Sequence, residues 1–138
     1  MTSTGPPERR RPRRILVAED ELLVAMEIEG ALHGLGYEVV GPVATVAEVE
    51  QLVDSAEFDG AVLDVNLRGL RIFTALPRLL ERGLPVLLSS GYQETAAFPQ
   101  EFRHLPALIK PYQPGQLEAA VEALLGSRDG TDSKRGKS

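Results

Sequence analysis

The stretch RRILVAEDELLVAMEI, residues 13–28, joins an apolar segment directly to a run of three acids. Residues 14–18 form a short and largely apolar segment, which is typical of a buried strand. Residues 19–21 are Glu-Asp-Glu, and an apolar pattern with helical spacing begins immediately after them. The stretch therefore predicts a buried strand that leads through an acidic turn into a helix.

The same order, a strand and then a helix, repeats along the chain. Predicted strands cover residues 14–18, 37–43, 60–63, 85–89 and 107–109, and predicted helices cover residues 22–35, 46–55, 72–82, 94–102 and 116–125. Short apolar strands that alternate with helices are typical of an open parallel sheet buried on both faces. The alternation therefore predicts an α/β fold with a doubly wound sheet of five strands and five helices.

Local signals refine three of the predicted helices. Thr45 can cap the helix of residues 46–55, and Glu48 stands at the capping-box position three residues later. Pro77 lies inside the predicted helix 72–82 and should kink it or delay its start. Pro99 should weaken the helix predicted over residues 94–102 for the same reason.

The predicted helix 22–35 has apolar residues at spacings of three and four, which define one apolar face. These residues are Leu22, Leu23, Met26, Ala31, Leu32 and Leu35. Gly36 is a natural stop for this helix. We expect its apolar face to pack on the sheet.

Composition indicates one globular domain between two polar ends. The chain has 138 residues, of which 43 % are hydrophobic, and it has no cysteine and no apolar run long enough for a membrane span. Residues 1–13 are predicted to be a disordered basic arm, residues 14–126 the folded domain, and residues 127–138 a disordered tail. Residues 15–126 hold 17 acids and six bases, so direct nucleic-acid binding is not expected.

Acidic residues follow two of the predicted strands at the point where each strand ends. Glu19 and Asp20 follow the first strand, and Asp64 follows the third. Sites in open parallel sheets form at the carboxyl ends of the strands, so these three carboxylates should converge if the two strands are neighbours. Converging carboxylates with no histidine or cysteine nearby predict a hard cation, Mg²⁺ or Mn²⁺. A carboxylate can also attack phosphorus and form an acyl phosphate.

A hydroxyl and an ammonium are expected at the same edge of the sheet. Ser89 and Ser90 end the fourth strand, and Lys110 ends the fifth. Lys110 is the only lysine between residues 15 and 126, and Pro111 after it could form a cis peptide bond. Together with the cation, a serine hydroxyl and Lys110 could hold the oxygens of a transferred phosphoryl group.

The segments ILVAEDE, AVLDVNL, PVLLSSGY and ALIKPY occur in this order over residues 14–126. In order and spacing they resemble the receiver domain of two-component response regulators, of the stand-alone type. The segment LSSGY resembles a loosened form of the Phe-Ala-Thr-Gly motif of one subgroup. The resemblance implies a flavodoxin-like sheet with strand order 2-1-3-4-5, and a role in phosphorelay signalling.

The resemblance also implies roles for individual residues. Asp64 would be the phospho-acceptor, which takes a phosphoryl group from a histidine kinase or a phosphotransfer protein. Glu19, Asp20 and Asp64 would hold Mg²⁺ together with the backbone carbonyl of Asn66. Phosphorylation would then switch binding to a downstream protein whose identity the sequence does not give.

The chain matches some positions of the family's switch and departs from another. Ser90 matches the family's Thr or Ser, and Lys110 matches its lysine. Many receivers carry a Tyr or Phe three residues before this lysine, but the residue here is Ala107. The usual aromatic readout is therefore missing, and Tyr92 or Tyr112 are the candidates to replace it.

Other functions remain open at the level of sequence. The missing aromatic residue suggests a protein-interaction module that keeps the fold and works without phosphate. An aspartyl phosphohydrolase would usually carry a second acid two residues after the nucleophile, where this chain has Asn66. We expect a cytoplasmic protein that is not an enzyme beyond its own phosphorylation and dephosphorylation, and the sequence leaves a homodimer open.

Overall fold

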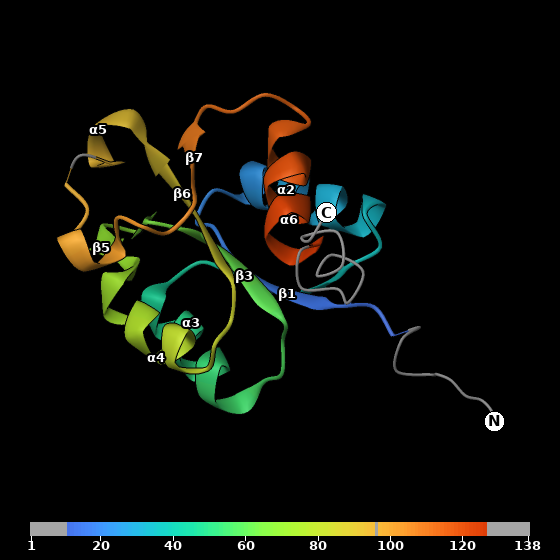
Figure 1. The fold of residues 1–138 in the computed structure, drawn as a ribbon, viewed down its shortest axis with the longest axis horizontal. Coiled ribbons are helices and arrows are strands. Elements are labelled where there is room, and N and C mark those ends of the chain that lie inside the picture. The colour runs from blue at the N-terminus through green and yellow to red at the C-terminus, as the bar shows by residue number, and fades with distance from the viewer. Residues whose placement is uncertain (1–10, 96, 127–138) are drawn as a thin grey trace, which may run out of the picture.

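The computed structural model describes residues 11–95 and 97–126, and these form a parallel sheet covered by helices (Figure 1). The strands of the sheet lie in the order β2-β1-β3-β6-β7. They are β1 (Arg14–Ala18), β2 (Glu38–Val43), β3 (Gly60–Asp64), β6 (Val86–Gly91) and β7 (Ala107–Lys110). All neighbouring strands pair in parallel, so the predicted five-stranded sheet and its strand order are confirmed.

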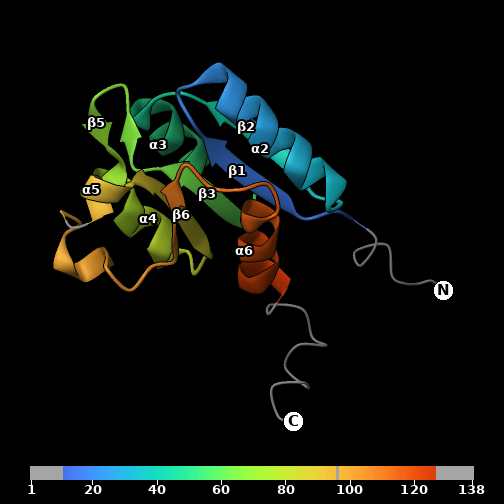
Figure 2. The same ribbon diagram turned by 90° about the horizontal axis from the view of Figure 1, so that it is seen from above.

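Helices cover both faces of this sheet (Figure 2). One face carries α2 (Leu22–Gly34) and α6 (Gln116–Leu125), and the other carries α3 (Val46–Ser55) and α4 (Leu76–Glu81). Side chains of one strand alternate between the two cores: Ile15 of β1 packs on the α2 side and Leu16 on the α3 side. Burial on both faces explains why the inner strands β1, β3 and β6 are mostly apolar.

The face that α2 turns toward the sheet differs from the predicted one. Its buried residues are Ala25, Ile28 and Leu32. In contrast, the predicted inward residues Leu22, Leu23 and Met26 are 73 %, 74 % and 56 % exposed. The helix carries two apolar stripes at helical spacing, and only contact with the sheet decides which one is buried. The prediction was therefore wrong for the first two turns of α2.

Two predictions from local signals are confirmed. Thr45 Oγ1 accepts a hydrogen bond of 3.1 Å from the Glu48 N–H, and the Glu48 carboxylate accepts from the Thr45 hydroxyl and the Ala44 N–H. This exchange caps the start of α3. The predicted helix 72–82 starts late, because a 3₁₀ turn η2 (Ile72–Thr74) comes first and Pro77 lies in the first turn of α4.

Among the described residues of the range 94–102, the predicted continuous helix does not form. A single turn, α5 (Tyr92–Thr95), and a 3₁₀ turn, η3 (Gln100–Phe102), take its place. Pro99 lacks an N–H for a helical hydrogen bond, and it disfavours a helical backbone at Phe98. The described residues therefore contain four helices of six residues or more and the one-turn α5.

A small hairpin that was not predicted follows β3. It consists of β4 (Asn66–Leu67) and β5 (Leu70–Arg71), which pair antiparallel. Its two-residue turn has positive φ angles, 54° at Arg68 and 87° at Gly69, as tight hairpin turns require. The hairpin brings the backbone that follows Asp64 back toward the end of β1.

The described residues include only part of the predicted polar ends. Residues 1–10 of the arm and the whole predicted tail, residues 127–138, lie outside them. Arg13 contacts the folded domain, since its Nη1 donates a hydrogen bond of 2.6 Å to the carbonyl of Leu125. Within residues 11–95 and 97–126, no helix is long and apolar enough to cross a membrane.

Candidate functional site

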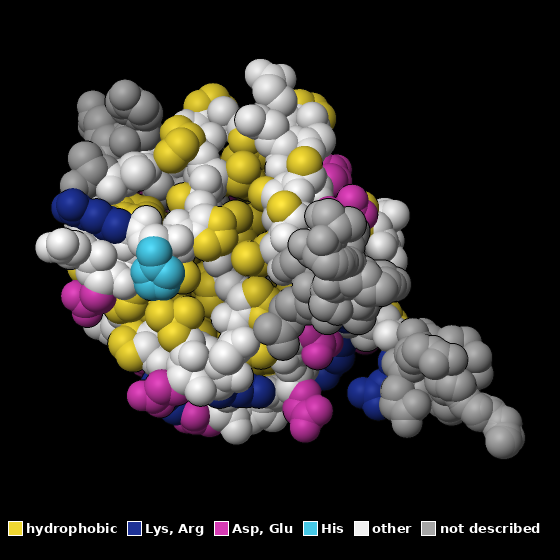
Figure 3. All heavy atoms as spheres, viewed as in Figure 1, with side chains coloured by type: hydrophobic (Ala, Val, Ile, Leu, Met, Phe, Trp, Pro, Cys, Tyr) yellow, Lys and Arg dark blue, Asp and Glu magenta, His cyan; other side chains and the backbone are white. Residues whose placement is uncertain are grey.

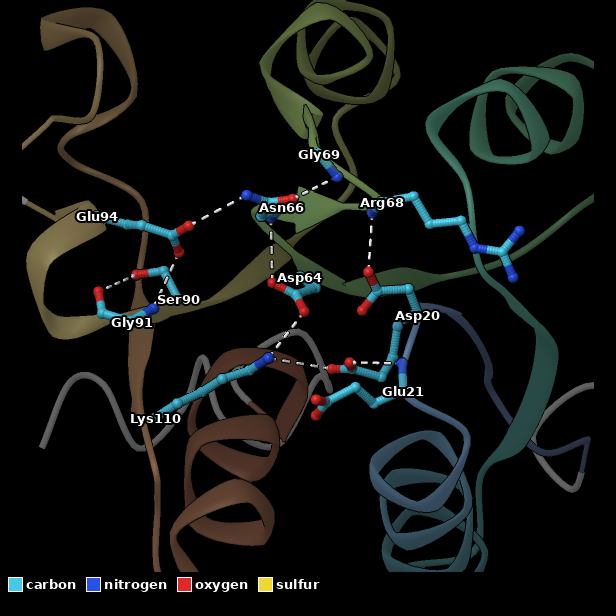
Figure 4. Close-up of polar contacts among 11 residues, drawn as sticks. Asp20, Glu21, Asp64, Asn66, Arg68, Gly69, Ser90, Gly91, Glu94 and Lys110 are labelled. Carbon is cyan, nitrogen blue, oxygen red and sulfur yellow. Dashed lines mark hydrogen bonds and ion pairs between the residues drawn. The ribbon is translucent and has the colours of Figure 1, made fainter.

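The predicted site residues at the ends of β1 and β3 lie together at the carboxyl edge of the sheet (Figure 4). One carboxylate oxygen from each of Glu19, Asp20 and Asp64 lies within 4.8 Å of the others. β1 and β3 are neighbours in the sheet, so the turn after β1 and the last residue of β3 meet. Lys110, at the end of β7, points its ammonium into the same cluster.

Asp64 is buried and has a hydrogen-bond partner on each oxygen. The residue is 4 % exposed. Its Oδ2 accepts a hydrogen bond of 2.8 Å from Lys110 Nζ, and its Oδ1 accepts one of 3.1 Å from the Asn66 N–H. These two contacts fix the orientation of the Asp64 carboxylate.

Glu19 is also buried, and its two oxygens differ. Oε2 accepts a hydrogen bond of 3.1 Å from the Glu21 N–H. Oε1 accepts no hydrogen bond and lies 3.5 Å from Lys110 Nζ. Burial, together with the nearby charge of Asp64, raises the pKa of Glu19 to about 7. The raised pKa indicates that the Lys110 ammonium alone does not offset the cost of burying this charge.

Lys110 is the one cation that contacts this cluster in the described part of the chain. Burial alone would lower its pKa, but its hydrogen bond to Asp64 and the charges of Asp64 and Glu19 outweigh burial and raise the pKa. The ammonium therefore stays charged at neutral pH. The peptide bond between Lys110 and Pro111 is cis. One ammonium leaves the three carboxylates incompletely neutralised.

The donor set suits a small hard cation. Asp20 Oδ2 accepts a hydrogen bond of 2.8 Å from the Arg68 N–H of the hairpin turn. The cluster offers carboxylate oxygens from three residues and contains neither histidine nor cysteine, which fits Mg²⁺ or Mn²⁺. The unbonded Oε1 of Glu19 and the excess negative charge both fit a bound cation. Asn66, whose backbone carbonyl is the fourth predicted ligand, begins β4 two residues after Asp64.

Ser90 lies near the cluster but has other partners. Its hydroxyl is buried, lies 3.0 Å from Thr95 Oγ1, and donates to the Gly91 carbonyl at 3.3 Å. Ser89 stands in register with Asp64 on the neighbouring strand, and its buried hydroxyl has no hydrogen-bond partner. Ser90 is therefore one residue further along β6 than Ser89, the residue that pairs with Asp64.

Sequence reasoning missed Glu94 as a residue of this site. Its Oε1 accepts a hydrogen bond of 3.1 Å from the Gly91 N–H, and its Oε2 accepts one of 3.4 Å from Asn66 Nδ2 (Figure 4). The spacing of three residues between Gly91 and Glu94 resembles a capping box and could have pointed to this contact. This contact was not predicted because the helix predicted over residues 94–102 begins two residues later than the observed turn α5.

Of the two tyrosines predicted as replacements for the missing aromatic residue, the structure describes the side chain of Tyr112 only. Tyr112 packs against the core between the sheet and the helices α2 and α6. Burial raises the pKa of Tyr112, and the charge of Glu19 acts in the same direction. The side chain of Tyr92 lies outside the described part of the structure. Ala107 is half-buried at the start of β7 and pairs with Leu88.

The sequence is similar to a known domain family and to two proteins that are named as regulators. The family model "Response regulator receiver domain" matches residues 15–122. The phyllosphere-induced regulator PhyR of Methylorubrum extorquens is 32 % identical over 118 residues, which cover 80 % of this chain and 43 % of PhyR. The transcriptional regulatory protein PdtaR of Mycobacterium tuberculosis is 28 % identical over 114 residues, which cover 80 % of this chain and 56 % of PdtaR. The chain thus spans about half the length of these two relatives.

A solved structure agrees with both the sequence match and the fold. The solution structure of SdrG from Sphingomonas melonis superposes with a TM-score of 0.72 at 36 % sequence identity. The superposition covers 83 % of this chain and 97 % of SdrG. The family match over residues 15–122, the sheet order and the acidic cluster at the strand ends all agree. This chain belongs to the response regulator receiver domain family.

Proposed function

We propose that this receiver domain accepts a phosphoryl group on Asp64 from a histidine kinase or a phosphotransfer protein. The observation that carries the proposal is the buried Asp64 carboxylate, which Lys110 holds at 2.8 Å beside two further carboxylates. Phosphorylation would change the affinity of the domain for a downstream protein in a phosphorelay. Such a domain catalyses its own phosphorylation and dephosphorylation and acts on no metabolite.

The proposed chemistry follows from the position of Asp64. One of its carboxylate oxygens attacks the phosphorus of a phosphohistidine, and the bond between phosphorus and the imidazole nitrogen breaks. The electron pair of that bond returns to the nitrogen, and Asp64 becomes an acyl phosphate. Attack of water on phosphorus later releases inorganic phosphate and restores the carboxylate.

Three other residues would stabilise the transferred group. Lys110 would move from the Asp64 carboxylate to a phosphoryl oxygen, since its ammonium has three donors. Ser90 would leave Thr95 and donate its hydroxyl to another phosphoryl oxygen. When bound, Mg²⁺ supplies positive charge for the phosphoryl oxygens. Support for a Mg²⁺ site comes from the acidic cluster and from the unbonded Glu19 Oε1.

The proposed Mg²⁺ ligands are side chains and one backbone group. Glu19, Asp20 and Asp64 would contribute carboxylate oxygens, and Asn66 would contribute its backbone carbonyl. Mn²⁺ prefers the same oxygen ligands and could replace Mg²⁺.

A protein donor needs a surface on which to dock beside Asp64. The exposed residues Leu22, Leu23 and Met26 form an apolar patch on the first two turns of α2, directly after the acidic turn of the site. Exposed apolar patches commonly mark protein contacts. We propose that the phosphodonor docks on this α2 patch. The absence of cysteine suits the cytoplasmic location that such a partner implies.

The downstream protein would use another surface. Figure 3 shows hydrophobic side chains gathered on the face that carries β7, the edge strand of the sheet, where Ile109 is 37 % exposed. Lys110 ends this strand, so a shift of Lys110 toward a phosphoryl group would act on the same edge.

A phosphate-independent interaction module is the second candidate. Two observations favour it: Ala107 replaces an aromatic switch residue, and the Ser90 hydroxyl contacts Thr95 rather than Asp64. In that case the α2 patch or the β7 edge would bind a partner with the same affinity in the presence and absence of phosphate.

The first experiment is intact mass after incubation with acetyl phosphate, with and without Mg²⁺. We expect one added phosphoryl group that requires Mg²⁺ and is lost in the Asp64→Asn variant. Asp54→Asn is the matched control, because Asp54 lies on the surface in an ion pair with Arg78. Labelling that persists in Asp64→Asn would refute the assignment. A wild-type protein that neither takes up phosphate nor binds Mg²⁺ would favour the interaction module.

A further inference from the structure

The last two residues of β6 carry two hydrogen-bond donors close to Asp64. Asp64 stands in register with Ser89 on the adjacent strand, and the next two residues supply the Ser90 hydroxyl and the Gly91 N–H. Figure 4 shows this end of β6 beside Asp64, on the side away from Asp20. A phosphoryl group added to Asp64 would extend from the carboxylate and present new anionic acceptors to the end of β6.

Both donors are already engaged by the single turn α5. The Gly91 N–H donates to Glu94 Oε1 at 3.1 Å. The Ser90 hydroxyl lies 3.0 Å from Thr95 Oγ1 and 3.3 Å from the Gly91 carbonyl, and its one proton can serve only one of these acceptors. In the arrangement that uses all three groups, Ser90 donates to Thr95 Oγ1, and Thr95 Oγ1 donates to the Gly91 carbonyl at 3.3 Å. We call this pair, Glu94 and Thr95, the α5 clasp.

Glu94 is a chemical analogue of the group it would compete with. A carboxylate and a phosphoryl group are both anionic oxygen acceptors, and both form strong hydrogen bonds with backbone N–H groups. The second oxygen of Glu94 accepts from Asn66 Nδ2 at 3.4 Å, so the clasp also reaches the segment that follows Asp64. Two anions cannot share the Gly91 N–H without mutual repulsion.

We propose that the α5 clasp holds the unphosphorylated state, because Glu94 occupies the Gly91 N–H and Thr95 engages the Ser90 hydroxyl. This inference rests on the proposed phosphorylation of Asp64. Phosphorylation then displaces Glu94 and Thr95, so α5 leaves its place at the end of β6. The clasp would supply a switch in a receiver that lacks an aromatic residue at position 107.

The test measures the affinity for beryllofluoride, a non-covalent analogue of the phosphoryl group, in the presence of Mg²⁺ by ¹⁹F NMR. We expect Glu94→Gln to bind it about three to ten times more tightly than wild type, because a charged acceptor is replaced by a neutral, weaker one. Thr95→Val, which keeps the shape and removes the hydroxyl, should also bind more tightly. Glu101→Gln is the matched control, since Glu101 is an exposed glutamate in η3.

A charge effect alone could also tighten binding in Glu94→Gln, so a second variant separates the two causes. Glu94→Asp keeps the charge, but its side chain is one methylene shorter and would no longer reach the Gly91 N–H. Tighter binding in both variants supports the clasp. Tighter binding in Glu94→Gln with wild-type affinity in Glu94→Asp would overturn it in favour of simple electrostatic repulsion.

A measurement without any phosphoryl analogue tests the contact itself. In ¹H–¹⁵N spectra, the Gly91 amide proton should shift upfield in Glu94→Gln and stay unchanged in Glu101→Gln, because only the first variant weakens its hydrogen bond. An unmoved Gly91 resonance would overturn the clasp. If wild type binds beryllofluoride and Glu94→Gln binds it equally well, the clasp alone fails. If no variant binds it, the proposed function fails and the clasp fails with it.

Discussion

Lys110 reaches across a whole strand to contact Asp64. The two residues end β7 and β3, which lie on either side of β6, and Lys110 Nζ still donates a hydrogen bond of 2.8 Å to Asp64 Oδ2. The same ammonium lies 3.5 Å from Glu19 Oε1. The Lys110 ammonium therefore links the ends of three strands. Its removal should affect stability, affinity for Mg²⁺ and phosphorylation in different directions.

Replacing Lys110 with Met should destabilise the metal-free protein and strengthen cation binding. Two buried carboxylates lose the lysine ammonium that pairs with them, and we expect the free energy of unfolding to fall by about 1–3 kcal/mol. This loss is small for a buried ion pair because the lysine is partly exposed. Mg²⁺ should bind more tightly, and phosphorylation by acetyl phosphate should fall at least tenfold. Thermal unfolding, calorimetric titration and intact mass measure the three effects.

Lys110→Arg is the control for this prediction, because it keeps the charge but alters the shape of the donor. We expect Lys110→Arg to retain most of the stability and to lose phosphorylation. Weaker Mg²⁺ binding in Lys110→Met would contradict the view that Lys110 and the cation neutralise the same carboxylates.

Stability without metal should fall as pH rises, because of Glu19. Burial raises the pKa of Glu19 to about 7 in the folded protein, against 4.5 as its ordinary value. Between these values the folded state binds more protons than the unfolded state, so the free energy of unfolding decreases with pH. We expect a loss on the order of 2 kcal/mol between pH 4.5 and pH 8 in EDTA. Chemical denaturation at several pH values measures it.

The Glu19→Gln variant should lack this part of the pH dependence. Mg²⁺ should also stabilise wild type more at pH 8 than at pH 5.5, since protons and the cation compete for the same carboxylates. Equal pH slopes for wild type and Glu19→Gln would show that another group causes the loss.

The sheet and its site could be predicted because both depend on simple one-dimensional patterns. Strands buried on two faces are mostly apolar, and polar residues at or after their last positions mark the strand ends. Glu19, Asp64 and Lys110 stand at such positions, so the topology alone brings them together. The cap formed by Thr45 and Glu48 could also be predicted from the sequence, because a capping box is a contact within four residues.

The missed features depend on contacts that the one-dimensional pattern does not contain. Helix α2 carries two apolar stripes, and contact with the sheet buries Ala25 and Ile28 rather than Leu22 and Met26. The helix predicted over residues 94–102 reduces to the one-turn α5 because Pro99 interrupts it. The contact of Glu94 with Gly91 then follows from where that short turn begins.

Removing the cap of α3 should destabilise the domain without affecting the site. Thr45→Ala deletes the hydroxyl that accepts from the Glu48 N–H, and we expect a cost of about 1 kcal/mol. Ser55→Ala is the matched control at the other end of α3, where an exposed hydroxyl donates to the Gln51 carbonyl. Urea denaturation should show a lower midpoint for Thr45→Ala only. Equal losses in both variants would mean that the cap has no special role.

The α2 patch should matter for a protein phosphodonor and not for a small one. Leu23 is 74 % exposed, so Leu23→Ser should leave the fold and labelling by acetyl phosphate unchanged within about twofold. Transfer from a phosphorylated histidine kinase that labels wild type should fall about tenfold, because docking loses an apolar contact of about 1.4 kcal/mol.

Leu70→Ser is the matched control for the patch. Leu70 is 63 % exposed on the hairpin β4–β5, which lies across the acidic cluster from α2 (Figure 4). We expect transfer from the kinase to Leu70→Ser to stay near the wild-type rate. Equal losses in Leu23→Ser and Leu70→Ser would mean that the donor covers both sides of the site. A loss in Leu70→Ser alone would indicate that the donor docks on the hairpin rather than on α2. The donor histidine must reach Asp64 from the side of the site on which the donor protein binds.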